Sequence, residues 1–178
     1  TSKNNLMPLG AYNKLFEWTA KELHDEFLGI HIAEDPSLSQ IGLLGYLLLN
    51  SASLGDACDM AERYFALVQR GSSLTYRVSG DICQFRYQAT PVGRQDIELT
   101  LAYLLMFIRH LLDRYYLPTT VYLPHDPPSN LEFHRTFFGE SIRYNHAYSG
   151  FDFEAILLEA PVNHAAQQLL GVLRNQAN

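Results

Sequence analysis

The spacing of apolar side chains predicts helices over much of the chain. Within Ala11–Phe27 and Leu54–Val68, apolar residues recur at the i, i+3, i+4, i+7 spacing of an amphipathic helix. The second segment has the cleaner pattern, and Ser53 precedes it as an N-cap, with Asp56 three residues on as a variant of the capping box. Ser39–Leu49 is apolar nearly all round, which is typical of a buried helix.

Alternation of apolar and polar residues predicts a β-hairpin in the middle of the chain. Residues 74–78 and 83–87 alternate on either side of a Gly-Asp turn. A short β-rich strand is predicted at Thr119–Leu123. Two further strands are predicted beyond it, one with the even positions of 142–146 on one face and one with the odd positions of 151–157 on one face.

The remaining apolar segments complete the predicted fold. Arg94–Asp113 is predicted to be the longest helix, and Asn130–Phe138 a short one with Ser129 and Glu132 as its capping box. A last helix is predicted to follow Asn163 as its cap. The order of helices, hairpin, long helix, strand, short helix, hairpin and helix indicates an α+β fold, in which helices cover a small, mostly antiparallel sheet.

Length, composition and charge narrow the class of protein. The 178 residues are most simply one domain, 1–178, and no linker-like tract divides them. Hydrophobic residues make up 47% and charged residues 18%, a balance that excludes a disordered chain. The net charge of −6 argues against direct nucleic-acid binding by this part of the protein, because an acidic surface repels phosphate.

The cysteines and the apolar stretches bear on the compartment. Cys58 and Cys83 match neither a disulfide framework nor a metal motif, so we expect reduced thiols in a cytoplasmic protein. The first residues do not form a signal peptide. Ile41–Leu49 and Leu99–Ile108 are each about half as long as the roughly 20 residues that span a bilayer, so no membrane association is expected.

No motif indicates an enzyme. Ile41–Gly45 lacks the serine of a nucleophile elbow, and the chain has neither a glycine-rich phosphate loop nor an HExxH zinc motif. Because no spacing of Ser, His and Asp singles out a triad, we expect no catalytic residues and no cofactor.

Metal binding is considered for one turn-helix segment and is not predicted. His125, Asp126 and His134 offer zinc ligands, but the two histidines are separated by two prolines and match no standard spacing. We expect His125 to bond a neighbouring backbone group and His134 to face solvent. At the start of the long helix, Arg94, with Asp96 and Glu98, is likewise expected to form a solvated face, where acids suit the positive end of the helix dipole.

A small-molecule site is the favoured functional feature. Ligand pockets combine apolar walls with a few polar groups, and buried tyrosine hydroxyls or an imidazole supply such groups. The candidate ligand-binding residues are Tyr46, Phe85, Tyr87, Tyr103, Phe107, Tyr122, Tyr144 and His146. Plain core packing is the alternative for each aromatic residue, and a hydrogen-bonded core histidine is the alternative for His146.

Six short motifs carry a family resemblance when their order is considered together. They are Leu28–Glu34, Ile41–Tyr46, Ser53–Ala57 with Arg63-Tyr64, Val121–Pro128, His134–Gly139 and Leu157–Val162. This series resembles the N-terminal domain of a subgroup of AraC/XylS-type transcription regulators, often labelled arabinose-binding domain-like and including ornithine-utilisation regulators. The likeness covers about residues 25–175.

The resemblance implies a ligand-sensing and dimerising domain that binds an unidentified small-molecule effector. Regulators of this kind bind DNA through a C-terminal domain with two helix-turn-helix motifs. No basic recognition helix precedes Asn178, so DNA binding is implied only for a longer parent protein, of which we expect this chain to be a fragment. Two alternatives stay open, a stand-alone binding or dimerisation module and, less favoured, an enzyme.

Overall fold

One five-stranded sheet organises the structure. The computed structural model describes residues 7–34, 42–90 and 92–162. The strands are β1 (Ser72–Ser79), β2 (Ile82–Ala89), β3 (Thr120–Tyr122), β4 (Ile142–Arg143) and β5 (Ser149–Glu154). Their order is β1-β2-β5-β3-β4, and every pair is antiparallel except β3 with β4. The predicted α+β class with a mostly antiparallel sheet is confirmed.

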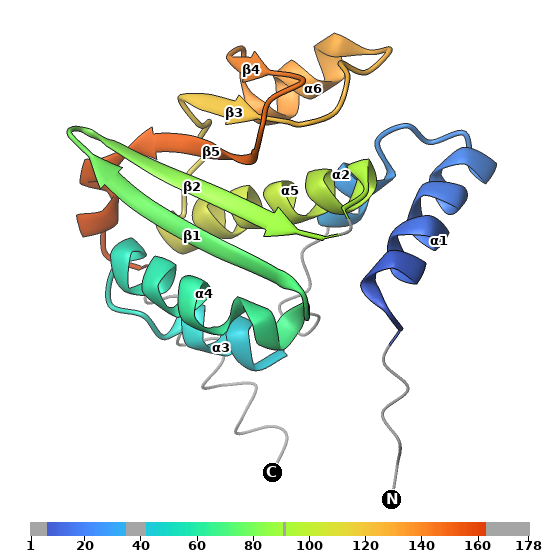
Figure 1. Cartoon of the computed structure of the whole chain (residues 1–178). Helices are drawn as coiled ribbons and strands as arrows, with labels where there is room; N and C mark the ends of the chain where they lie inside the picture. Colours follow the sequence, from blue (N-terminus) through green and yellow to red (C-terminus); the bar gives the residue numbers. More distant parts are fainter. Residues whose placement is uncertain (1–6, 35–41, 91, 163–178) are drawn as a thin grey trace, which may run out of the picture.

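Helices pack against this sheet (Figure 1). They are α1 (Leu9–Glu22), α2 (Leu28–Ala33), α3 (Gly42–Leu49), α4 (Leu54–Val68), α5 (Arg94–Leu112), α6 (Leu131–Phe138) and the short 3-10 helix η2 (Ala155–Glu159). α5 runs along the sheet, α2 packs on α5, and α3 packs on α4, which in turn contacts β1. α6 lies beside β3 and β4, and α1 packs against α5.

The helix α4 forms as its sequence predicts. The Ser53 hydroxyl accepts from the Asp56 amide, and the Asp56 carboxylate accepts from the Ser53 amide, so the capping box is complete. Leu54, Ala57, Cys58, Ala61 and Phe65 are buried along one face. Val68, expected on the same stripe, is 43% exposed, because the helix ends there.

The central hairpin is also confirmed. Ser79 pairs with Ile82 across the Gly-Asp turn, and Gly80 adopts the positive φ that this turn needs. On β2 the side chains of Cys83, Phe85 and Tyr87 are buried toward the core.

Both C-terminal strands are shorter than predicted. β4 ends at Arg143, so the expectation that Tyr144 and His146 extend its face is wrong. β5 ends at Glu154, where the chain turns into η2, so Ala155 and Leu157 do not continue the strand. Local alternation does not reveal where strand pairing stops.

The predicted helix Ala11–Phe27 is two helices. α1 ends at Glu22, His24 has a positive φ, and the Asp25 carboxylate accepts from the Phe27 amide at 3.0 Å before α2 begins. Leu15 and Leu23, expected on the buried face, are 48% and 62% exposed.

The start of α6 corrects another expectation. Asn130, not Ser129, is the N-cap, and its side chain accepts from the Phe133 amide. Ser129 instead bonds to the Glu26 carboxylate through its amide and hydroxyl. The start of the predicted helix Ser39–Leu49 and the helix predicted after Asn163 lie outside the described residues.

Candidate functional site

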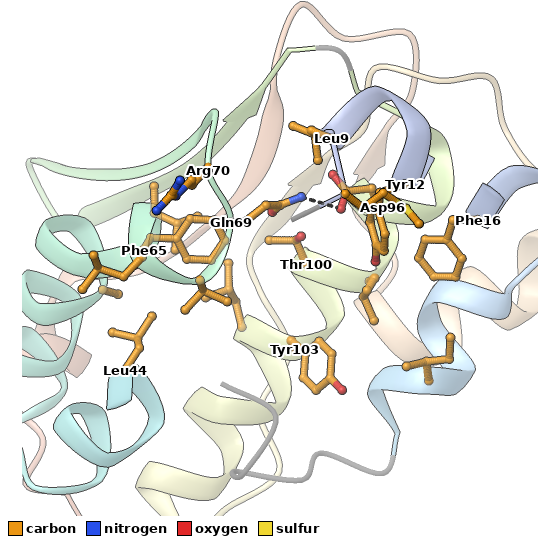
Figure 2. Close-up of a pocket in the computed structure, with 18 of the residues that line it drawn as sticks. Leu9, Tyr12, Phe16, Leu44, Phe65, Gln69, Arg70, Asp96, Thr100 and Tyr103 are labelled. Carbon is orange, nitrogen blue, oxygen red and sulfur yellow. Dashed lines mark hydrogen bonds between the residues drawn. The ribbon is translucent and has the colours of Figure 1, made fainter. Parts of the chain in front are cut away.

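A pocket of about 980 Å³ lies among the helices α1, α3, α4 and α5 (Figure 2). Its lining residues include Leu9, Tyr12, Phe16, Leu44, Phe65, Gln69, Arg70, Asp96, Thr100, Tyr103 and Phe107. Most of its wall is aliphatic or aromatic. This combination of size, apolar wall and few polar groups is that of a small-molecule site.

One stripe of α5 forms a side of the pocket. Asp96, Thr100, Tyr103 and Phe107 follow one another at spacings of four, three and four residues, which places them on one face of a helix. Figure 2 shows Thr100 and Tyr103 on α5, with Tyr12 and Phe16 of α1 on one side. The pocket therefore depends on how α1 is held against α5.

Asp96 is the acid in the pocket wall, and it is 2% exposed. The oxygen atoms Asp96 Oδ2 and Tyr87 Oη are 2.6 Å apart, and Gln69 Nε2 donates to Asp96 Oδ1 at 2.8 Å. Burial raises the pKa of Asp96, although the hydrogen bonds from Tyr87 and Gln69 oppose this shift.

The donor count around Asp96 fits a protonated carboxyl. The Tyr87 hydroxyl also lies 3.0 Å from Gln69 Oε1, and a single O–H cannot donate both there and to Asp96. If Asp96 carries a proton, it donates to Tyr87, Tyr87 donates to Gln69 Oε1, and Gln69 Nε2 donates back to Asp96. Within this ring each group then donates one hydrogen bond and accepts one, and Thr100 is a further hydrogen-bond partner of Tyr87.

Tyr12 is the pocket hydroxyl contributed by α1. Burial, followed by the nearby Asp96 carboxyl, raises the pKa of Tyr12 to about 12. Its hydroxyl therefore stays protonated at neutral pH and is able both to donate and to accept a hydrogen bond.

A second polar cluster lies around Glu98, which is fully buried. Arg94 Nε lies 2.8 Å from Glu98 Oε1, and the Nε2 atoms of His134 and His125 lie 3.1 and 3.3 Å from that same oxygen. Arg94 also pairs with Glu26 at 3.0 Å. The Glu98 cluster, comprising Glu98, Arg94, His125 and His134, ties α5 to α6 and to the turn before it.

This cluster overturns two expectations. Asp96 and Glu98 do not form a solvated face, because α5 is covered on both the pocket side and the α6 side. His134 does not face solvent: it is fully buried, and its Nδ1 lies 3.0 Å from the Tyr144 hydroxyl. The expectation for His125 is confirmed, since its Nδ1 lies 2.8 Å from the Asp126 carbonyl oxygen.

Neither cluster has the form of a metal centre. Within the described residues, no three His, Cys, Asp or Glu side chains are arranged to hold a metal ion. In the Glu98 cluster, the Arg94 guanidinium already binds the carboxylate oxygen that both histidines approach.

The structure brings only some of the eight candidate residues to the pocket. Tyr103 and Phe107 line it, and Tyr87 reaches its wall through the bond to Asp96. Phe85 stacks on Phe151 in the core, with ring centroids 5.5 Å apart. Tyr46 is half-buried on α3 and is not among the lining residues.

The other three candidates lie elsewhere. The Tyr122 and His146 rings pack at 4.7 Å, and Tyr122 also stacks near the Arg86 guanidinium, on the face of the sheet opposite the core. Tyr144 stacks on His134. The eight candidate residues therefore do not gather at one place.

Sequence reasoning missed Asp96, Thr100, Tyr12 and Gln69. A usable signal was present for two of them, because extending the helical stripe of Tyr103 and Phe107 toward the N-terminus reaches Thr100 and then Asp96. Gln69 gave no such signal, because it follows the end of a helix and only the fold brings it to Asp96.

Small-molecule sites in proteins commonly combine an apolar wall with a few polar groups, as this pocket does. The chain belongs to the family described as the arabinose-binding domain of AraC transcription regulator, N-terminal, whose profile matches residues 1–162. This is a family of transcription-regulator domains and not an enzyme family.

Comparison with solved structures agrees with this fold. The chain is similar to the transcriptional regulator CdpR from Pseudomonas aeruginosa, with a TM-score of 0.67 and 20% sequence identity, over 92% of this chain and 56% of that chain. This chain thus spans little more than half of that regulator's length. A search of the curated proteins finds no match. No helix in the described part of the chain is long and apolar enough to cross a membrane.

Proposed function

We propose that this domain senses a small-molecule effector that binds in the pocket between α1, α4 and α5. The observation that carries the proposal is the pocket of about 980 Å³, with apolar walls and a few polar groups gathered near Asp96. The family assignment supports it, because the family is described as a binding domain of transcription regulators. The word arabinose in that description fits this pocket poorly, since a sugar needs many polar partners.

The effector acts by favouring one arrangement of α1 against α5. A ligand shifts such an equilibrium only by its differential affinity for the two states. The pocket wall is shared between α1, through Tyr12 and Phe16, and α5, through Thr100 and Tyr103. An occupant that touches both helices therefore stabilises the arrangement in which both contact it.

A pocket-filling variant tests this function. Leu104 lines the pocket and is half-buried, so Leu104→Trp should occupy the space without removing a polar group. We expect a metabolite screen by thermal shift to yield compounds that stabilise the wild type and lose their effect in the folded variant. Hits that stabilise both proteins equally would bind elsewhere and would contradict the proposal.

Regulation of transcription is proposed for the longer parent protein, in a cytoplasmic setting. DNA binding would then come from a domain outside this chain, since these residues carry a net charge of −6. A homodimer is also proposed, and α1 offers exposed apolar residues for it, Leu15, Trp18 and Leu23. Analytical ultracentrifugation of the wild type and Trp18→Glu tests dimerisation.

A further inference from the structure

Three acidic side chains are buried in the described residues, Asp96, Glu98 and Asp152. Two of them have an arginine: Arg94 Nε lies 2.8 Å from Glu98, and an Arg86 nitrogen lies 2.8 Å from Asp152. Asp96 has no Arg, Lys or His within ion-pair distance among the described residues. Its hydrogen-bond partners are the neutral side chains of Tyr87 and Gln69.

Asp96, the buried acid without an arginine partner, is also the one that lines the pocket. An ionised carboxylate taken out of water is costly unless a cation accompanies it. Glu98 and Asp152 meet this requirement within the protein, whereas the partners of Asp96 are neutral donors. A cation bound in the pocket would supply the positively charged partner that Asp96 lacks among the described residues.

The surroundings of Asp96 suit an organic cation better than a hydrated ion. The lining includes Tyr12, Phe16 and Tyr103, whose rings attract an ammonium group through their faces. Arg70 is the cationic lining residue, and it is exposed rather than paired with Asp96. A wall of this kind accepts a cationic head on an apolar body.

Gln69 stands where such a head would bind. Its Nε2 donates to Asp96 Oδ1 at 2.8 Å, and the residue itself lines the pocket (Figure 2). Gln69 follows the last residue of α4 and is half-buried, so its side chain is not fixed within a helix.

We propose that the pocket selects an effector with a protonated amine on an apolar or aromatic body, and that Asp96 is its counter-charge. The inference rests on the proposed function and names the chemical class of the ligand. When the ion pair forms, the amine keeps its proton and the Asp96 carboxyl releases its own proton to solvent. Tyr12 and Tyr87 lie near this group as neutral hydroxyls. Arg70 is the cationic residue among the described lining residues.

Three probes of one shape separate the alternatives. Phenylbutylamine, phenylbutanol and phenylbutyrate each have a phenyl ring on a four-carbon chain and end in a cationic, neutral or anionic group. The carboxylate carbon of phenylbutyrate is the fourth carbon of its chain. Calorimetric titration of the purified protein should give an affinity for the amine about tenfold to a hundredfold above that for the alcohol, as a hydrogen bond to a charged group allows. The butyrate should bind more weakly than the alcohol.

Two variants assign the preference to Asp96. Asp96→Asn keeps the shape and removes the charge, so the amine should lose at least about ten times more affinity than the alcohol. Gln69→Lys places a tethered ammonium at the carboxyl and should abolish the preference for the amine. Asp113→Asn makes the same chemical change at the exposed C-terminal end of α5 and should leave all three affinities as in wild type.

The outcomes are distinguishable. Equal affinity for the three probes, each lost in Leu104→Trp, would overturn the amine proposal and leave the pocket as the effector site. Tightest binding by the butyrate, lost in Arg70→Gln, would likewise overturn it in favour of an anionic effector. Binding that Leu104→Trp does not weaken would contradict the proposed function itself, whereas no saturable binding by any probe would overturn the amine proposal.

Discussion

His134 Nε2 lies 3.1 Å from Glu98 Oε1, and both side chains are completely buried. The contact joins the middle of α6 to the first turns of α5, on the side of α5 that faces away from the pocket. Asp96 and Glu98 are only two residues apart, so they lie on opposite sides of α5. Asp96 lies on the pocket side and Glu98 on the side of α6. The Glu98 cluster therefore fixes the position of α5 on the side that faces away from the pocket.

Removing the charge of Glu98 should destabilise the fold strongly. Glu98→Gln leaves the half-buried Arg94 guanidinium without its nearest carboxylate, although the pair of Arg94 with Glu26 remains. We expect a loss of about 3 kcal/mol in the free energy of unfolding, measured by urea denaturation. Glu62→Gln breaks the exposed pair with Arg77 and should cost less than about 1 kcal/mol. Equal losses in the two variants would contradict a structural role for the cluster.

The same cluster should make stability depend on pH. Burial lowers the pKa of His125 below its usual value of about 6.5. As the pH falls below about 6.5, the unfolded chain binds a proton at this residue before the folded chain does, so the free energy of unfolding decreases with falling pH. His125→Asn should reduce this slope in urea titrations between about pH 8 and about pH 5. An unchanged slope would mean that His125 has the same pKa in both states.

The sequence predicts most of the fold because most elements depend on local patterns. The capping box of Ser53 and Asp56 and the alternation around the Gly80 turn act within a few residues, and both predictions are confirmed. The site depends on contacts between distant segments. Gln69 meets Asp96 from 27 residues away, and Glu26 reaches Ser129 across 103 residues, and no periodicity encodes such pairs.

The prediction of a solvated face at Asp96 and Glu98 fails for a related reason. Charged residues near a helix start are usually exposed, and the helix dipole explains them well. In this fold α6 and its preceding turn cover one acid, and Tyr87 and Gln69 cover the other. Burial of an acid follows from which partners arrive from other elements, and single-sequence patterns do not show this.

A close backbone contact should also prove essential for the position of α5. Gly29 lies where α2 packs on α5, and a Cβ atom there would be 2.4 Å from the carbonyl oxygen of Gln95. Gly29→Ala should push the helices apart and cost about 1–3 kcal/mol in thermal or urea unfolding. Gly55→Ala makes the same change where the nearest atom, the Leu158 carbonyl oxygen, is 3.1 Å away, and gains helix propensity. A smaller loss for Gly29→Ala than for Gly55→Ala would refute the close packing of α2 on α5.

Asp96 should give a pH dependence opposite in sign to that of His125. Burial raises the pKa of Asp96 above the value of about 3.9 that it has in an unfolded chain. As the pH rises through this window, the unfolded chain releases a proton that the folded chain still holds, so the wild type loses stability with rising pH. Asp96→Asn cannot titrate and should be spared this loss.

The measurement is the difference in unfolding free energy between Asp96→Asn and the wild type, followed by urea denaturation from about pH 4 upward. The difference should move in favour of the variant as the pH rises and become constant once the folded Asp96 is ionised. Asp113→Asn, an exposed change on the same helix, should show no such trend. A difference that stays flat for Asp96→Asn would mean that the folded protein holds this carboxyl as readily ionised as the unfolded chain does, and the protonated ring with Tyr87 and Gln69 would be refuted.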